Sequence, residues 1–183
     1  MNDFNENKTV GRLSELLALK RGYDPAKAKQ LKTAAVLHDI GKAGVPASIL
    51  NKPDKLTTQE FEIMKTHTKL GVEMLASVQG DLGDLAKMIC LFHHEWHNPL
   101  FGGYWGVSTY FLPDYISIVS VCDVFTALLE RRVYKEPWPP KDAVDYIEKQ
   151  AGTQFCPELV KDFILMIRDD SRVPALFAAI KTP

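Results

Sequence analysis

The apolar residues of this sequence recur at intervals of three and four, the spacing that places side chains on one face of an α-helix. The first such stripe contains Val10, Leu13, Leu16 and Leu17, and its helix is expected to end near Gly22. No segment of useful length alternates apolar and polar residues as a half-buried strand does. The sequence therefore predicts an all-α fold, a helical bundle. The other expected helices are 26–38, a segment that begins after 57, 85–94, 115–129, 141–151, 157–168 and about 172–181.

The segment after residue 57 has the clearest helix start. Thr57 and Glu60 match a capping box, in which a hydroxyl and a carboxylate satisfy free backbone N–H groups at the first turn. We expect one helix from this point that carries apolar residues near one face. These residues are Phe61, Met64, Leu70 and Met74.

The length of 183 residues suits one domain with a full core and is too short for two of ordinary size. We expect a single domain over 1–183, with a core at about 10–163 and a C-terminal helix at about 172–181. The longest irregular segment is 97–113, which contains three glycines and two prolines. Long irregular loops in compact domains are usually functional or mobile.

Composition excludes several classes of protein. The formal charge of −1 gives no general attraction to DNA or to a membrane surface. The three cysteines, Cys90, Cys122 and Cys156, are odd in number and form no CxxC pair, so neither a disulfide framework nor a zinc–thiolate site is suggested. No apolar run could span a bilayer, and Met1 leads into a polar stretch. We therefore expect a cytoplasmic protein with no membrane or DNA partner.

Histidines and aspartates interrupt the apolar helical stretches. A single histidine in such a stretch is most often a core residue bonded to a carbonyl group. A buried carboxylate, however, costs several kcal/mol unless a cation or dense hydrogen bonding compensates it. Divalent metal ions would satisfy both kinds of side chain together. The residues concerned are His38, Asp39, His67, His93, His94 and Asp123.

The spacing of these residues favours two ions over one. Neighbouring helical residues diverge by about 100°, so His38 and Asp39 cannot both point straight at one ion. They can embrace a pair, with the histidine on one ion and the carboxylate bridging both; His93 and His94 can act likewise. Ions about 3.5–4 Å apart can bind a phosphate and generate hydroxide at neutral pH. Imidazole and carboxylate ligands favour iron or manganese, with zinc or nickel possible.

Several motifs in order give the chain a resemblance to the HD-GYP domain, the bacterial branch of the HD superfamily that hydrolyses cyclic di-GMP. The resemblance extends from about Val10 to Phe163. The motifs are His38-Asp39-Ile40-Gly41-Lys42, Ile49-Leu50-Asn51-Lys52-Pro53, Lys65-x-His67, His93-His94-Glu95, Asp123-Val124-Phe125-x-Ala127-Leu128 and Ala151-Gly152-Thr153-Gln154-Phe155-x-Pro157-Glu158-Leu159.

This resemblance implies a helical bundle around a two- or three-metal centre, held by the six histidines and aspartates named above. It implies catalytic roles for Asp39 and Lys42, with Lys42 contacting a substrate phosphate. Arg132 and Lys135 match positions that bind the phosphates and guanine of the substrate, and Tyr104 belongs to the loop that supplies substrate contacts. Without the resemblance, Arg132 and Lys135 would be interpreted as solvated surface charges.

One departure concerns the first helix, where the family usually has another metal-binding histidine. The corresponding place falls near Glu6, on the same helical face as Val10 and Leu17. Glu6 is either an additional metal ligand or part of a frayed, exposed terminus. Asn2 stands where members with three metals carry a glutamate, which argues against a third ion.

A second departure is the loop that in the family contains Asp-Gly-x-Gly-Tyr-Pro. Here Gly103 and Tyr104 remain, Trp105 replaces the proline, and the aspartate is missing. The aromatic rings of 97–113 either stack on a base, or pack beneath the loop or against a signalling protein partner. His97 is a proton donor, an extra ligand, or neither. Other polar positions are also replaced, which can cost roughly 10–100-fold in metal affinity or activity: Ser117, Thr126, Val133 and Cys156.

Three functions remain open. The first is a metal-dependent phosphodiesterase that hydrolyses a cyclic dinucleotide such as cyclic di-GMP, and the retained ligands favour it. The second is a hydrolase of another nucleotide phosphate ester, favoured by the altered loop. The third is a non-catalytic module that binds metal or nucleotide and signals through a partner.

Overall fold

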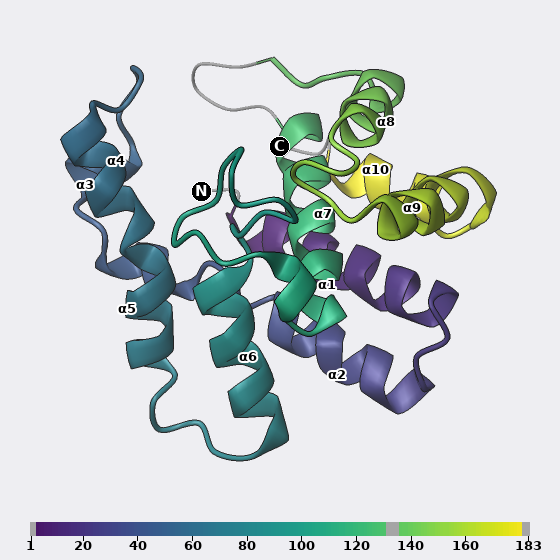
Figure 1. The fold of residues 1–183 in the computed structure, drawn as a ribbon, viewed down its shortest axis with the longest axis horizontal. Helices are drawn as coiled ribbons and strands as arrows, with labels where there is room; N and C mark the ends of the chain where they lie inside the picture. Colours follow the sequence, from purple (N-terminus) through teal and green to yellow (C-terminus); the bar gives the residue numbers. More distant parts are fainter. Residues whose placement is uncertain (1–2, 131–135, 181–183) are drawn as a thin grey trace.

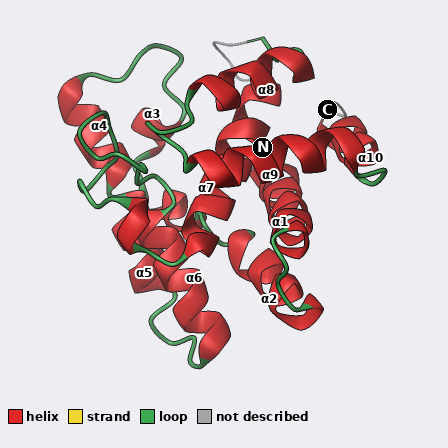
Figure 2. Ribbon diagram, turned by 45° about the vertical axis from the view of Figure 1, so that its right-hand side comes forward, coloured by secondary structure: helices red, strands yellow, loops and turns green. Residues whose placement is uncertain are grey.

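The structure is a computed structural model that describes residues 3–130 and 136–180, with side chains described for 6–130 and 136–176. Within these ranges it contains helices, turns and loops but no β-strand, so the prediction of an all-α fold is confirmed (Figures 1 and 2). The elements are α1 Asp3–Lys20, α2 Pro25–Ala35, the 3-10 helix η1 Ile40–Gly44, α3 Ala47–Leu50, α4 Thr58–Lys65, α5 His67–Met74, α6 Asp81–Phe92, the 3-10 helix η2 Thr109–Phe111, α7 Asp114–Leu129, α8 Pro140–Lys149, α9 Pro157–Asp169 and α10 Val173–Ile180.

Helix α7 lies at the centre of the molecule (Figure 1). Its sequence is apolar on nearly every side, and such a helix is stable only when it is surrounded by other elements. It contacts α1, α6, α8 and α9. Phe125 of α7 and Phe163 of α9 are fully buried, with ring centroids 5.1 Å apart in an edge-to-face arrangement. This apolar packing fixes α7, and with it the position of Asp123.

Helices α1 and α2 form a pair that lies along α7 and α6. The turn between them places Gly22 at φ 84°, and the Asp24 side chain caps α2 by accepting hydrogen bonds from the N–H groups of Ala26 and Lys27. Arg21 forms ion pairs with Asp114 at 3.3 Å and Asp162 at 2.6 Å, which tie this turn to α7 and α9.

The expected long helix after residue 57 is wrong, although its start is right. The capping box of Thr57 and Glu60 is present. The helix ends at Lys65, however, and α5 begins at His67. At the break, both the N–H and the hydroxyl of Thr66 donate to the carbonyl of Ile63, which tightens the last turn of α4. The apolar stripe is therefore split, and Phe61 and Met74 are each 43% exposed.

Two other helix boundaries differ from expectation and shape the site. Helix α2 ends at Ala35, and the following residues form a tight turn in which the N–H of His38 donates to the carbonyl of Ala35. Helix α6 begins earlier than predicted and ends at Phe92, so His93 and His94 follow the helix instead of lying within it. The pair His38–Asp39 and the pair His93–His94 therefore both lie shortly after the end of a helix, α2 and α6 respectively.

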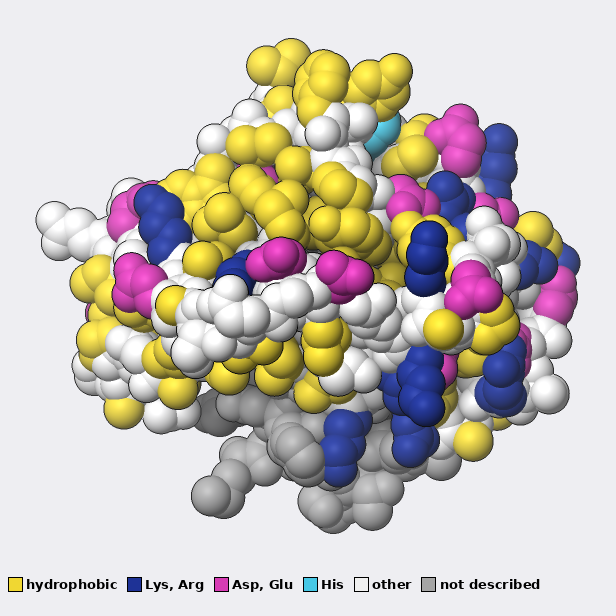
Figure 3. All heavy atoms as spheres, turned by 90° about the horizontal axis from the view of Figure 1, so that it is seen from below, with side chains coloured by type: hydrophobic (Ala, Val, Ile, Leu, Met, Phe, Trp, Pro, Cys, Tyr) yellow, Lys and Arg dark blue, Asp and Glu magenta, His cyan; other side chains and the backbone are white. Residues whose placement is uncertain are grey.

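The surface seen from below in Figure 3 has hydrophobic side chains gathered in its middle and charged side chains around them. Among the described residues, no helix combines the length and the apolar composition needed to cross a membrane. Several large hydrophobic residues are exposed in the loop between α6 and α7: Leu100, Phe101, Tyr110 and Phe111.

Candidate metal centre

Four separate segments bring the predicted ligands together. His38 and Asp39 lie on the turn between α2 and η1, and His67 is the first residue of α5. His93 and His94 directly follow α6. Asp123 lies within α7. All six lie close together between these elements, although the segments that carry them are far apart in the sequence.

Backbone contact holds two of these segments together. Gly41 of η1 lies directly against α5, where a Cβ atom at this position would collide with the carbonyl group of His67 and the backbone nitrogen of Gly71. Only glycine permits such a close approach. The turn with His38 and Asp39 is therefore placed against the start of α5 by main-chain atoms.

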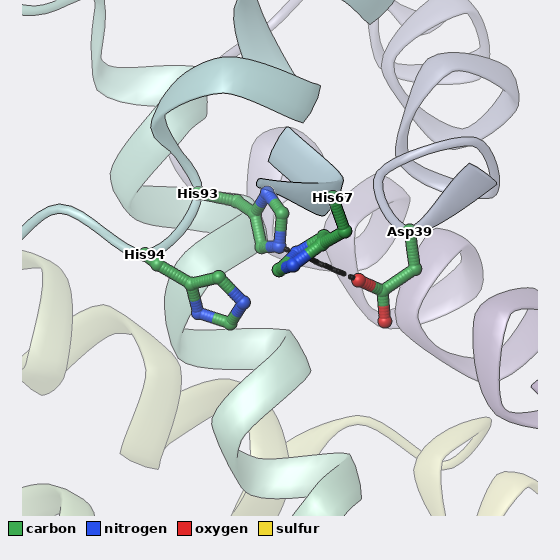
Figure 4. A group of neighbouring side chains, drawn as sticks. All are labelled: Asp39, His67, His93 and His94. Carbon is green, nitrogen blue, oxygen red and sulfur yellow. Dashed lines mark ion pairs between the residues drawn. The ribbon is translucent and has the colours of Figure 1, made fainter. Parts of the chain in front are cut away.

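One group of potential ligands consists of Asp39, His67, His93 and His94, shown in Figure 4. Their nearest ligand atoms all lie within 4.8 Å of one another. Oδ1 of Asp39 is 3.2 Å from Nε2 of His67 and 3.7 Å from Nε2 of His93. The imidazoles of His67 and His93 converge on this carboxylate (Figure 4).

A second group consists of His38, His93 and Asp123, again with ligand atoms within 4.8 Å. Nε2 of His38 is 3.2 Å from Oδ2 of Asp39 and 3.4 Å from Oδ1 of Asp123. The two oxygens of Asp39 thus face different histidines, and His93 belongs to both groups. Two cations, one in each group, would therefore lie close together, with His93 between them.

The orientation of the histidines leaves ligand atoms without partners. Nδ1 of His38, His67 and His93 each lies 2.7 to 2.9 Å from a carbonyl oxygen of the preceding turn. That contact makes Nδ1 the proton donor and directs the lone pair of Nε2 towards the centre. Within the described part of the chain, these three Nε2 atoms and Oδ1 of Asp39 are buried without a hydrogen-bond partner. Since such groups are costly to bury, the donor set fits a divalent cation.

The electrostatics of the centre also favour positive charge. Burial alone would lower the pKa of His38, but the carboxylates of Asp39 and Asp123 outweigh burial and raise it well above its ordinary value. Burial would raise the pKa of Asp39, but His38 and Lys42 hold it well below its ordinary value. In contrast, burial and the neighbouring His93 lower the pKa of His94 well below its ordinary value.

Lys42 reaches the edge of the centre from η1, and its Nζ lies 2.5 Å from Oδ2 of Asp39. Burial would lower the pKa of Lys42, but Asp39, Asp123 and Glu6 raise it above its ordinary value. The ammonium group is therefore charged at neutral pH and lies where it could also contact an anionic substrate.

Glu6 is buried on α1, with only 7% of its surface exposed, and its charge acts on Lys42. The interpretation of this residue as part of an exposed, frayed terminus is wrong, because α1 begins at Asp3 and turns Glu6 inwards. Glu6 belongs to neither group of potential ligands. Asn2, Arg132, Val133 and Lys135 lie outside the described residues.

Tyr104 covers one side of the centre. Its ring centroid lies 4.4 Å from that of His94 with the planes 33° apart, and Phe61 contacts the tyrosine edge-to-face at 5.7 Å. Burial, followed by the charge of Asp39, raises the pKa of Tyr104 to about 12. Its hydroxyl therefore keeps its proton at neutral pH and can act as a hydrogen-bond donor. His97 joins neither group of potential ligands, and its backbone N–H donates to Gln154.

Glu95 was part of a motif in the sequence, but its role could not be predicted. The side chain is only 1% exposed. Its carboxylate accepts hydrogen bonds from the backbone N–H groups of Tyr104, Trp105 and Val107. The signal in the sequence was a carboxylate directly after a histidine pair, and that signal equally suits another metal ligand.

Comparison with known proteins places this geometry in context. The HD domain family matches residues 3–159. A cyclic di-GMP phosphodiesterase of Thermotoga maritima is 37% identical over 171 residues, which cover 92% of this chain and 46% of that protein. The 3'3'-cGAMP-specific phosphodiesterase 2 of Vibrio cholerae is 37% identical over 159 residues, which cover 83% of this chain and 29% of that protein. The chain thus spans less than half the length of these relatives.

Solved structures share the fold at lower sequence identity. Bd1817, an HDG"Y"P protein from Bdellovibrio bacteriovorus, aligns with a TM-score of 0.69 at 21% identity, covering 88% of this chain and 51% of that one. The HD domain of the L. monocytogenes phosphodiesterase PgpH, in complex with cyclic-di-AMP, aligns with a TM-score of 0.65 at 21% identity, covering 100% and 93% of the two chains. The helical arrangement described above is therefore that of a known fold.

Proposed function

This chain belongs to the HD domain family, and we propose that it acts as a metal-dependent phosphodiesterase that hydrolyses a cyclic dinucleotide such as cyclic di-GMP. The observation that carries the proposal is the pair of overlapping groups, in which, among the described residues, Nε2 of three histidines and Oδ1 of Asp39 are buried without a hydrogen-bond partner. The named activities of the relatives, on cyclic di-GMP and on 3'3'-cGAMP, support the cyclic dinucleotide class. We take the active unit to be one domain over 1–183.

In this proposal, two divalent ions are held by the six histidines and aspartates, and iron or manganese suits the ligands better than zinc or nickel. When bound, such ions supply a nucleophile at neutral pH and positive charge beside the scissile phosphate. Asp39 would hold an ion through Oδ1 together with His67, while its Oδ2 lies between His38 and Lys42 and keeps the carboxylate in this orientation. The carbonyl contacts of His38, His67 and His93 hold the imidazoles in the orientation that binding requires.

Residues around the ions bind and orient the substrate. Lys42 is charged and lies at the edge of the centre, where its ammonium group can hold a phosphate oxygen and offset developing negative charge. The protonated hydroxyl of Tyr104 can donate a hydrogen bond to the same phosphodiester. Arg132 and Lys135 are proposed to contact the second phosphate and a base, on the resemblance alone.

The test combines metal content with turnover on a single sample. Protein purified anaerobically is analysed for elements and then incubated with cyclic di-GMP, 3'3'-cGAMP and cyclic di-AMP. We expect about two ions per chain and hydrolysis of at least one substrate. If a metal-replete sample cleaves only another nucleotide phosphate ester, the protein is a hydrolase of that substrate class and not of cyclic dinucleotides. Failure to bind metal even after reconstitution would overturn the proposal.

A second function, a signalling module without catalysis, is favoured by the loop between α6 and α7. Leu100 is 89% exposed and Phe111 81% exposed, whereas large hydrophobic side chains are usually at least partly covered. Such a surface suits a protein partner. Binding of a cyclic dinucleotide by the metal-replete protein, without any product, would favour this function over hydrolysis.

A further inference from the structure

A buried carboxylate beside the candidate metal centre, that of Glu95, binds the backbone of a loop. Glu95 follows His94 directly, yet both its oxygens are already used by backbone donors. Oε1 accepts from the N–H groups of Tyr104 at 3.0 Å and Trp105 at 2.7 Å, and Oε2 accepts from Val107 at 2.8 Å. Three bonds from N–H groups to one carboxylate are charge-assisted and stronger than bonds between neutral groups. Glu95 is therefore fixed in place and is absent from both groups of potential ligands.

The backbone of this loop is shaped to converge on that carboxylate. Gly103 has φ 104° and Gly106 has φ 74°, backbone conformations that favour glycine, and with them the N–H groups of three residues between 104 and 107 point at this carboxylate. A Cβ atom on Gly103 would lie 3.2 Å from Oε2 of Glu95 and 3.3 Å from the backbone nitrogen of Trp96. A Cβ atom on Gly106 would meet nothing. The fit between loop and carboxylate is thus tight at one glycine and open at the other.

Anchoring this backbone decides where two aromatic rings lie. The ring of Tyr104 packs on His94 at 4.4 Å. The ring of Trp105 lies beneath the ammonium group of Lys69, whose Nζ is 3.9 Å from the ring centroid. A cation at this distance is attracted to the face of the indole. The Trp105 side chain therefore holds the loop from outside while Glu95 holds it from inside.

We infer that Glu95 is a positioning residue, which clasps the 104–107 backbone and thereby keeps the ring of Tyr104 against His94. The inference rests on the proposed function, since it assigns the way in which one side of that same site is built. Tyr104 is the group that touches the site, and Glu95 acts through it. Without the clasp, the loop that carries Tyr104 loses three backbone bonds and the ring loses its fixed place over the imidazole.

The first test measures the loop directly and needs no substrate. Hydrogen exchange of the backbone amides of Tyr104, Trp105 and Val107 is followed in the metal-free Glu95→Gln variant. A glutamine oxygen can accept some of these bonds, but its amino group must face another donor. We expect exchange at these amides to be roughly tenfold faster or more, with exchange in α7 unchanged. Unchanged exchange at 104–107 would overturn the inference whatever the activity of the protein.

Two glycine variants provide the matched comparison, and they guard against misfolding of the glutamine variant. Gly103→Ala pushes a methyl group against the Glu95 carboxylate, whereas Gly106→Ala introduces a methyl group at another positive φ with open space around it. Gly103→Ala should accelerate exchange at the three amides more than Gly106→Ala does. Equal acceleration by both would show that backbone strain matters and the carboxylate does not, and would overturn the inference.

The second test separates positioning from general stability with a double-mutant cycle. In the native background, Glu95→Gln should lower kcat/KM by about 10- to 100-fold, with the same division between kcat and KM that Tyr104→Ala shows. In the Tyr104→Ala background it should have little further effect, since both changes remove one ring from one place. Multiplied losses would mean that Glu95 acts by another route. If the native protein hydrolyses no cyclic dinucleotide, the proposed function fails, while the exchange measurement still decides the role of Glu95.

Discussion

Two regions of the molecule meet along α7, and they differ in the kind of side chain that they bury. On the side of α1 and α9, buried side chains such as Phe125 and Phe163 are apolar and pack closely against one another. On the side of η1, α5 and α6, the described side chains include three buried imidazoles and the Asp39 carboxylate, each with an inward atom that has no hydrogen-bond partner. In the first region, folding removes apolar surface from water, and this burial stabilises the protein. The second region costs stability unless a cation occupies its centre.

The difference shows that one helix can both pack in an apolar core and present a carboxylate to a polar centre, provided that the two kinds of side chain lie on different faces of the helix. Asp123 lies within α7 among mostly buried apolar residues, yet its carboxylate faces His38. The packing of the apolar region holds this carboxylate near the imidazole. Substitutions in the two regions should therefore have opposite signatures, with activity lost in one and stability lost in the other.

The sharpest way to test the separation is Asp39→Asn. An amide is a poorer cation ligand than a carboxylate, so on the proposed function we expect hydrolysis to fall by roughly 1000-fold or more, because bound ions would lower the activation barrier by several kcal/mol. The measurement is kcat/KM together with metal content. Asp145→Asn on the surface of α8, which removes a partner of Lys141, is the matched control and should leave hydrolysis unchanged. Full activity in Asp39→Asn would contradict the assignment of the centre.

Phe163→Ala tests the apolar side. Removing a fully buried ring that contacts Phe125 should lower the free energy of unfolding by about 3–5 kcal/mol, measured by denaturant titration. Activity per folded molecule should persist, since α9 contributes none of the predicted ligands. Phe111→Ala, at a ring that is 81% exposed, should change the stability by less than about 0.5 kcal/mol. A large loss of activity in folded Phe163→Ala protein would show that the two regions are coupled.

The pH dependence of metal affinity follows from the polar side. The pKa of His38 is raised in the metal-free protein, so this imidazole keeps a proton above its ordinary pKa of about 6.5. A metal ion must displace that proton. Apparent affinity should therefore increase about tenfold per pH unit from neutral pH upwards, until the pH passes the raised pKa. Calorimetry in buffers with different ionisation enthalpies measures the released proton. An affinity independent of pH would mean that metal binding does not displace a proton from His38.

The smallest effect is expected at a site that belongs to neither region. Hydrogen bonds from Lys52 and from the backbone N–H of Thr57 lower the pKa of Glu60 to about 2, compared with an ordinary value of 4.5. A lowered pKa adds stability above pH 4.5 that is lost as the pH falls towards 2. Glu60→Gln should therefore slightly lower the unfolding midpoint at pH 7, and the difference should vanish near pH 2. A difference that persists at pH 2 would contradict a role for the Glu60 charge.

The sequence predicted the all-α fold and the residues that meet at the centre, because both depend on patterns within the chain. Helical spacing is visible in the stripe around Val10, and charged or imidazole groups within apolar runs stand out in any sequence. The functional roles of these residues stay predictions. The pattern could not predict where α2 and α4 end. The tight turns at His38 and Thr66 use hydrogen bonds to backbone carbonyl groups, and a continuing helix would use some of the same groups.

Contacts between distant segments were also beyond the sequence. The alternatives for Glu6 differed only in whether α1 starts early enough to bury it, and packing of α1 against other helices decides that. To predict what Glu95 binds, one would need the path of the backbone nine to twelve residues later. That path depends on the positive φ angles of Gly103 and Gly106. Such loop geometry leaves no periodic trace.

The contact of Gly41 with the backbone of α5 has a consequence for how proteins of this kind can diverge. Main-chain atoms are the same in every sequence, so a spacing that they define is inherited unchanged when the neighbouring side chains are exchanged. Side chains around the centre can then be exchanged without a compensating change in this main-chain contact. Grafting a new loop onto this scaffold should accordingly preserve Gly41 as well as the residues to which a role is assigned above.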